Sequence, residues 1–80
     1  MSMNGYFQGL IDKKKELEKI KEKQQKLEAQ RSKLEETMKK SDYEVQVPED
    51  IRIANSEKLS QLKGEIEKLA EAFRNLELIP

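Results

Sequence analysis

Apolar residues recur along two long stretches of the chain with the alternating three- and four-residue steps of a heptad repeat. The first stretch carries Leu17, Ile20, Leu27, Leu34 and Met38, with the polar residues Gln24 and Arg31 at two of its steps. The second carries Leu59, Leu62, Ile66, Leu69, Phe73 and Leu76. This period places each set on one side of an α-helix. The pattern therefore predicts two long helices, each with one apolar stripe.

The first helix is expected to span residues 12–40. No Gly or Pro occurs in this range, and Lys, Glu, Leu and Gln, which favour helix, dominate it. Asp12 is suited to cap the N-terminus, because its carboxylate can accept hydrogen bonds from backbone N–H groups of the first turn. Residues 1–11 contain Gly5 and Gly9 and are expected to form a flexible N-terminal segment.

A turn is expected over 41–47. Its apolar residues alternate with polar ones, and they are Tyr43, Val45 and Val47. A period of two predicts a short extended segment. Tyr43 is expected to close the turn by packing against one of the two valines, and stacking on an unpaired RNA base is the alternative. Pro48 favours the first turn of a helix, so the second helix is expected to span 48–78.

Because the connection is short, the two stripes are buried most readily if the second helix folds back on the first. The predicted fold is all-α, an antiparallel two-helix coiled-coil hairpin over residues 12–79 with a short extended turn. Its register pairs Leu17 with Leu76, Ile20 with Phe73, Leu27 with Ile66, Leu34 with Leu59, Lys14 with Glu77, and Glu28 with Lys63. In this register Arg31 faces Leu62, and its long side chain is expected to lean out to solvent.

Composition excludes most chemistry for this chain. The 16 basic and 16 acidic residues give zero net charge, 40% of positions are charged, and His and Cys are absent. We therefore expect no catalytic residue, no cofactor and no metal site. No apolar run is long enough to cross a membrane, and no signal peptide is recognisable, so we expect a cytoplasmic protein without membrane contact.

Zero net charge conceals a difference between the two halves. Residues 1–40 have a balance of +4 and residues 41–80 a balance of −4. Heptad spacing gathers five lysines of the first helix into what we call the lysine ridge: Lys15, Lys19, Lys23, Lys26 and Lys33. Such a ridge can track the phosphates of a polyanion without reading bases. The alternative is a solvated coiled-coil face without a binding role.

Two segments carry a resemblance to a known family. They are Phe7-Gln8-Gly9-Leu10-Ile11-Asp12, which opens the first helix, and Ser41-Asp42-Tyr43-Glu44-Val45-Gln46-Val47-Pro48 at the turn. With the flanking heptads, residues 7–79 resemble the C-terminal arm of valyl-tRNA synthetase, and the turn is closer to eukaryotic cytosolic-type enzymes than to bacterial ones.

The resemblance implies a non-catalytic arm that touches the outer corner of tRNA, where the D and T loops meet. Its partners would be valine tRNA and the catalytic body of the synthetase, and the hairpin would be monomeric. The lysine ridge is predicted from charge placement alone. A second hypothesis is a protein-interaction coiled coil that dimerises or docks a partner helix through the same stripes.

Overall fold

The computed structural model describes the backbone of residues 2–80 and the side chains of residues 12–80. Three helices follow one another along the chain: α1 (Ser2–Met38), α2 (Tyr43–Gln46) and α3 (Glu49–Glu77). Within residues 2–80 there is no β-strand. The prediction of an all-helical fold with two long helices is confirmed.

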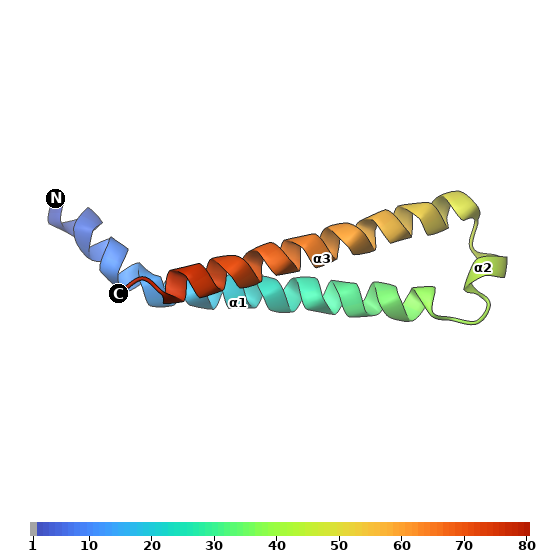
Figure 1. Cartoon of the computed structure of the whole chain (residues 1–80), viewed down its shortest axis with the longest axis horizontal. Coiled ribbons are helices and arrows are strands. Elements are labelled where there is room, and N and C mark those ends of the chain that lie inside the picture. The colour runs from blue at the N-terminus through green and yellow to red at the C-terminus, as the bar shows by residue number, and fades with distance from the viewer. Residues whose placement is uncertain (1) are drawn as a thin grey trace.

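The two long helices form a rod. Helices α1 and α3 lie side by side, and α2 lies in the connection at one end of the pair (Figure 1). The molecule measures 61 × 20 × 15 Å, and its radius of gyration is 18.4 Å. A compact globule of the same length would have a radius of gyration of about 12 Å. The chain therefore has a core one residue layer deep between two helices.

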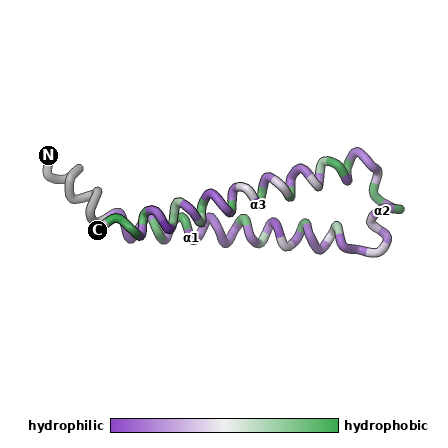
Figure 2. The backbone as a smooth tube through the Cα atoms, in the orientation of Figure 1, coloured by the Kyte–Doolittle hydropathy of each residue, from purple (hydrophilic) through white to green (hydrophobic). Residues whose placement is uncertain are grey.

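This core is the seam between the apolar stripes of α1 and α3. Leu62 and Ile66 are its most buried residues, at 4% and 9% exposure. The other stripe positions are half-buried, and they are Leu17, Ile20, Gln24, Leu27, Arg31, Leu34, Met38, Leu59, Leu69, Phe73 and Leu76. Apolar segments alternate with polar ones along α3 and along the coloured part of α1 (Figure 2). Because the described part of the chain has only two long helices, each of them screens one side of the other.

The prediction of an extended segment in the turn is wrong, because Tyr43–Gln46 forms the single helical turn α2. The backbone N–H of Val47 donates to the carbonyl oxygen of Tyr43 at 3.0 Å. Tyr43 is buried and Val47 half-buried, whereas Val45 is 87% exposed. Apolar residues at every second position had suggested one face of a strand. Tyr43 and Val47, however, are four residues apart and therefore also share one face of a helix. The segment is too short for its period to decide between them.

Tyr43 fastens α2 to α3. The residue is 7% exposed, and its hydroxyl oxygen accepts a hydrogen bond from Asn55 Nδ2 at 2.9 Å. Arg52 Nε donates to the carbonyl oxygen of Val47 at 3.0 Å. Tyr43 therefore bonds to α3 through its hydroxyl group, and the expected packing of its ring against a valine stays a prediction. A buried ring is not available to stack on an RNA base.

At the opposite end of the rod, Lys13 joins α1 to the C-terminus of α3. Its Nζ donates to the carbonyl oxygen of Glu77 at 3.4 Å and also to that of Ile79. The sequence register had placed Lys14 near Glu77. Lys13 lies four residues before Leu17, on the stripe side of the helix, and its stem is half-buried, so its ammonium reaches the last carbonyl groups. A positive charge there also complements the helix dipole.

The boundaries predicted from sequence agree closely with those of α3 and less closely with those of α1. Pro48 is the N-cap of α3, and Glu49 and Asp50 lie in its first turn. Helix α1 begins at Ser2 and not at residue 12, so Asp12 lies inside the helix and does not cap it. The flexibility predicted for residues 1–11 stays a prediction, and their side chains, like all of Met1, lie outside the described residues.

Gly64 lies inside α3, and a methyl group added there would meet no atom within 4 Å. We expect Gly64→Ala to raise the free energy of unfolding by about 1 kcal/mol, because Ala loses less backbone entropy in a helix. Ala29→Gly, at an exposed position of α1, is the matched control and should lower it by a similar amount. Urea unfolding followed by circular dichroism measures both. Destabilisation by Gly64→Ala would contradict a continuous helix at this position.

Leu62 should carry more of the stability than any exposed leucine. We expect Leu62→Ala to lower the free energy of unfolding by about 2 to 5 kcal/mol, since it removes apolar volume from the best covered layer of the seam. Leu78, at 80% exposure, is the matched control, and Leu78→Ala should change stability by less than about 0.5 kcal/mol. Equal losses in the two variants would contradict the placement of the seam.

Candidate nucleic-acid interface

All five residues of the lysine ridge lie on α1 with exposed side chains. Lys19, Lys26 and Lys33 follow one another at intervals of seven residues, and Lys15 and Lys23 each lie four residues from Lys19. At about 100° per residue, the five side chains fall within an arc of about 80°. The helix therefore brings all of them to one side, away from the centre of the seam.

Lys19 also takes part in an ion pair on the surface. Its Nζ lies 3.5 Å from Glu16 Oε1, and the two side chains are 71% and 51% exposed. Exposed pairs of this kind contribute at most about 1 kcal/mol, because solvent screens the charges. Exchange of this partner for a phosphate would therefore cost little.

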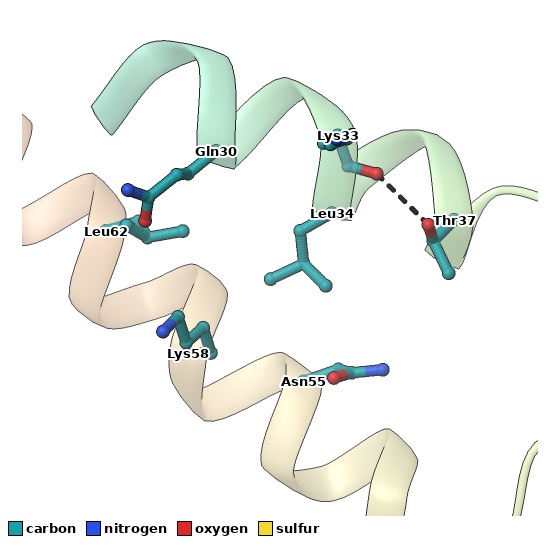
Figure 3. Close-up of a pocket in the computed structure, with 7 residues that line it drawn as sticks. All are labelled: Gln30, Lys33, Leu34, Thr37, Asn55, Lys58 and Leu62. Atoms are coloured by element: carbon teal, nitrogen blue, oxygen red, sulfur yellow. Dashed lines mark hydrogen bonds between the residues drawn. The ribbon is translucent and has the colours of Figure 1, made fainter. Parts of the chain in front are cut away.

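Two clefts open between α1 and α3 on the side toward which the ridge extends. The first is lined by Gln30, Lys33, Leu34, Thr37, Asn55, Lys58 and Leu62. Figure 3 shows these residues on both helices, with Thr37 Oγ1 donating to the carbonyl oxygen of Lys33 at 3.1 Å. The second is lined by Lys23, Leu27, Glu65, Lys68 and Leu69. Each cleft thus has a ridge lysine on α1 and another lysine on α3.

Lys58 and Lys68 were missed by sequence reasoning, which sought the basic surface on the first helix alone. The available signal was their heptad position. Lys58 is four residues before Leu62, and Lys68 is one before Leu69, so both flank the apolar stripe of α3. Side-by-side packing of α1 and α3 then brings each of them to a cleft that a ridge lysine also lines.

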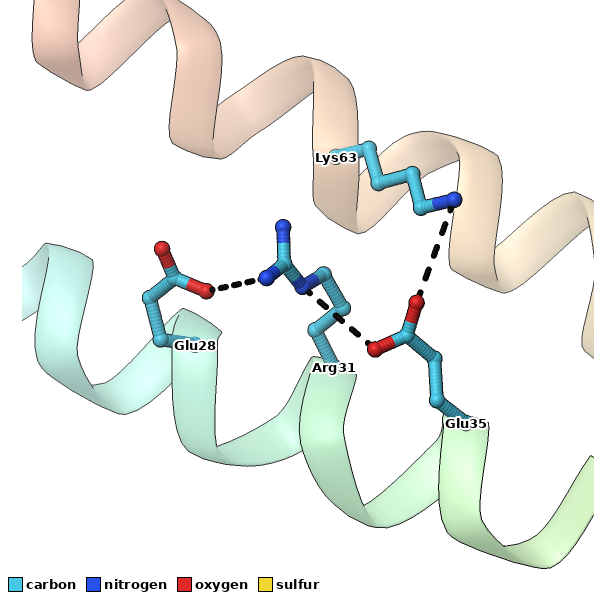
Figure 4. A network of polar contacts seen from close by, with 4 residues as sticks. All are labelled: Glu28, Arg31, Glu35 and Lys63. Atoms are coloured by element: carbon cyan, nitrogen blue, oxygen red, sulfur yellow. Dashed lines mark ion pairs between the residues drawn. The ribbon is translucent and has the colours of Figure 1, made fainter.

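The other side of the seam carries a network of ion pairs (Figure 4). Arg31 Nη2 lies 3.1 Å from Glu28 Oε1, and Arg31 Nε lies 3.7 Å from Glu35 Oε1. Lys63 Nζ lies 3.9 Å from Glu35 Oε2, so the network joins the two helices. The sequence register had paired Lys63 with Glu28, but Glu35, one heptad further along the same column, is its partner.

The expectation that Arg31 leans out to solvent is wrong. Its side chain is 34% exposed and lies between Glu28 and Glu35, and its buried Nε has no hydrogen-bond partner among the described residues. Two carboxylates four and three residues away on α1 hold the guanidinium at the edge of the seam. On this side of the rod, Arg31 and Lys63 therefore lie next to carboxylates.

Among the described side chains, 12–80, no group of three or more acidic residues, His or Cys could hold a metal ion.

Between Ser2 and Pro80, no helix combines the length and apolar character needed to cross a lipid bilayer.

The fold and its surface define an elongated helical module whose polar sides differ in charge. Comparison with known proteins shows which proteins the chain is similar to. The chain is 40% identical over 76 residues to a valine–tRNA ligase from Takifugu rubripes, 38% over 71 residues to one from Caenorhabditis elegans, and 35% over 72 residues to one from Homo sapiens. These matches cover 95%, 89% and 90% of this chain. The predicted resemblance to valyl-tRNA synthetase of eukaryotic type is confirmed.

The chain spans 6 to 7% of the length of these ligases. It is therefore similar to one small segment of each of them. No family model and no solved structure matches the chain.

The half-buried charge of Arg31 should limit stability. We expect Arg31→Leu to raise the free energy of unfolding by about 1 kcal/mol, because an apolar residue fills the seam without desolvating an ion. Arg74→Leu, at an exposed position of α3, is the matched control and should change it by less than about 0.5 kcal/mol. Chemical unfolding of both variants tests this expectation. A loss of stability in Arg31→Leu would instead show that the network with Glu28 and Glu35 stabilises the pair.

Proposed function

We propose that this chain is a non-catalytic tRNA-binding arm of a valine–tRNA ligase. The observation that carries the proposal is the similarity, over about nine-tenths of the chain, to ligases whose name specifies tRNA as substrate. In this proposal the arm is an antiparallel two-helix coiled-coil hairpin at the C-terminus of the ligase. It contacts the outer corner of valine tRNA and supports aminoacylation by holding the tRNA in orientation.

The lysine ridge supplies the chemistry for this role. Lysine presents a compact positive charge on a long flexible stem, so it attracts phosphate without reading a base. Its binding to RNA releases condensed cations, which gives affinity that decreases with salt. Paired RNA hides its base edges in a deep, narrow groove, so such an arm would recognise shape and backbone. Lys15, Lys19, Lys23, Lys26 and Lys33 are assigned to phosphate contacts.

Catalysis belongs to the rest of the ligase in this proposal, since the chain corresponds to 6 to 7% of its relatives' length. The catalytic body would be the arm's covalent neighbour, and the cytoplasm its compartment. The hairpin is proposed to be monomeric. In the alternative hypothesis, a partner helix uses the apolar stripes, but α1 and α3 already cover each other's stripes along the seam. A partner would have to separate them first.

The test is binding of fluorescent valine tRNA to the chain over a series of salt concentrations from about 50 to about 200 mM. We expect affinity to decrease steeply with salt. Lys19→Glu combined with Lys26→Glu should weaken binding and reduce the slope of log affinity against log salt by about 1.4 to 1.8, because two phosphate contacts are lost.

The matched control is Lys14→Glu combined with Lys21→Glu. These two lysines are also exposed, also seven residues apart on α1, and lie in the same column as Glu28 and Glu35, across the seam edge from the ridge. The control should bind nearly as the parent chain does. Equal binding by both variants and the parent would reject the ridge. Sedimentation of the parent should give a monomer, and a dimer that excludes tRNA would favour the protein-interaction hypothesis.

A further inference from the structure

The two sides of the seam differ in the charges that they offer to a partner. We call the side with the two clefts the groove flank and the side with the Glu28–Arg31–Glu35–Lys63 network the ion-pair flank. On the ion-pair flank, acidic and basic groups neutralise one another within 3.1 to 3.9 Å. On the groove flank, the described cleft residues include four lysines: Lys23, Lys33, Lys58 and Lys68. None of these four forms an ion pair within the described part of the chain.

We propose that the RNA backbone lies along the groove flank and is held from both helices, with Lys58 and Lys68 of α3 binding phosphates together with the ridge lysines of α1. This inference rests on the proposed function and adds to it the face of the rod and two residues of the second helix. The phosphate-binding surface is thus a two-sided channel and not a ridge along one helix.

The placement of the lysines favours a strand that follows the seam. Lys33 and Lys58 line one cleft from opposite helices, and Lys23 and Lys68 line the other. Within each helix the two lysines are ten residues apart, which corresponds to about 15 Å along the axis. Each cleft is therefore lined by one lysine from each helix. A polyanion lying between the helices meets positive charge on both sides at two levels.

The ion-pair flank is unsuited to the same partner. A phosphate near Lys63 would also approach Glu35, whose Oε2 lies 3.9 Å away from its ammonium group. Arg31 is held at 3.1 Å by Glu28. Binding there would require these pairs to break and would bring carboxylates close to phosphates, and like charges at short distance repel. The groove flank has no comparable cost.

The clefts themselves are suited to a backbone better than to a small molecule. The larger one, about 360 Å³, is shallow and is lined by two long lysines, amide side chains and seam leucines. It offers no convergent set of fixed polar groups of the kind that orients a small ligand. Its apolar floor is accessible to the sugar, and its lysines flank the phosphates. Among the described residues that line the two clefts, Glu65 carries the only carboxylate, so it should weaken binding locally.

The test uses the 80-residue chain, valine tRNA and the same salt series. Lys58→Gln combined with Lys68→Gln should reduce the slope of log affinity against log salt by about 1.4 to 1.8, because two phosphate contacts are lost. Lys63→Gln combined with Arg74→Gln removes the same charge from the other side of α3 and is the matched control. Glu65→Gln should strengthen binding, whereas Glu67→Gln, an exposed acidic residue beside the ion-pair flank, should do so less.

The outcomes separate this inference from the function on which it rests. Weaker binding by the groove pair, with the control pair unchanged, supports the channel. Equal weakening by the two pairs overturns it, since net charge alone would then act. Unchanged binding by the groove pair overturns the channel. If Lys19→Glu with Lys26→Glu still weakens binding in that case, the proposed tRNA-binding arm stands. If neither set of variants alters binding, the proposed function fails as well. Circular dichroism confirms that each variant is helical.

Discussion

Within the described side chains, 12–80, the apolar stripes of α1 and α3 cover each other, and the rod depends on this mutual burial. Burial is deepest at Leu62 and Ile66, and elsewhere the stripe residues stay partly exposed. Apolar surface removed from water contributes about 25 cal/mol per Å². A seam one layer deep therefore gives a small free energy of unfolding, and a single polar residue in the seam changes it noticeably. Hydrogen bonds add to it at both ends of the rod: Asn55 joins α3 to Tyr43 of α2, and Lys13 joins α1 to the last carbonyl groups of the chain.

Much of this arrangement could be predicted from sequence because a heptad repeat leaves few choices. Every stripe position from Leu17 to Leu76 is half-buried or buried, and the second helix begins within one residue of its predicted start. The predictions that failed concern short or local features. Three alternating residues around Tyr43 are too few to separate a strand from a helical turn. The prediction that Arg31 leans out to solvent considered only its long aliphatic stem and not its ion pairs with the two glutamates. Asp12 was predicted to begin the first helix because its side chain can cap a helix, but α1 begins at Ser2.

The candidate site shows the same division. Helical spacing was sufficient to place the five ridge lysines on one side of α1. It was not sufficient to identify Lys58 and Lys68, because opposition across a seam depends on how α1 and α3 pack, and the charge balance of the second half is negative. A local excess of lysine on one flank of α3 is hidden by acidic residues elsewhere on the same helix. Net charge by segment is thus a poor guide where a helix presents several faces.

The proportions of the rod have a mechanical consequence. A body 61 Å long with a cross-section of 20 × 15 Å acts as a lever if one end is joined to a larger partner. Any rotation at that junction displaces the far end in proportion to the length, so modest bending at the base would sweep α2 through a wide path. Contacts made near α2 would require a fixed angle at the junction, whereas contacts made midway along the rod would tolerate a larger rotation.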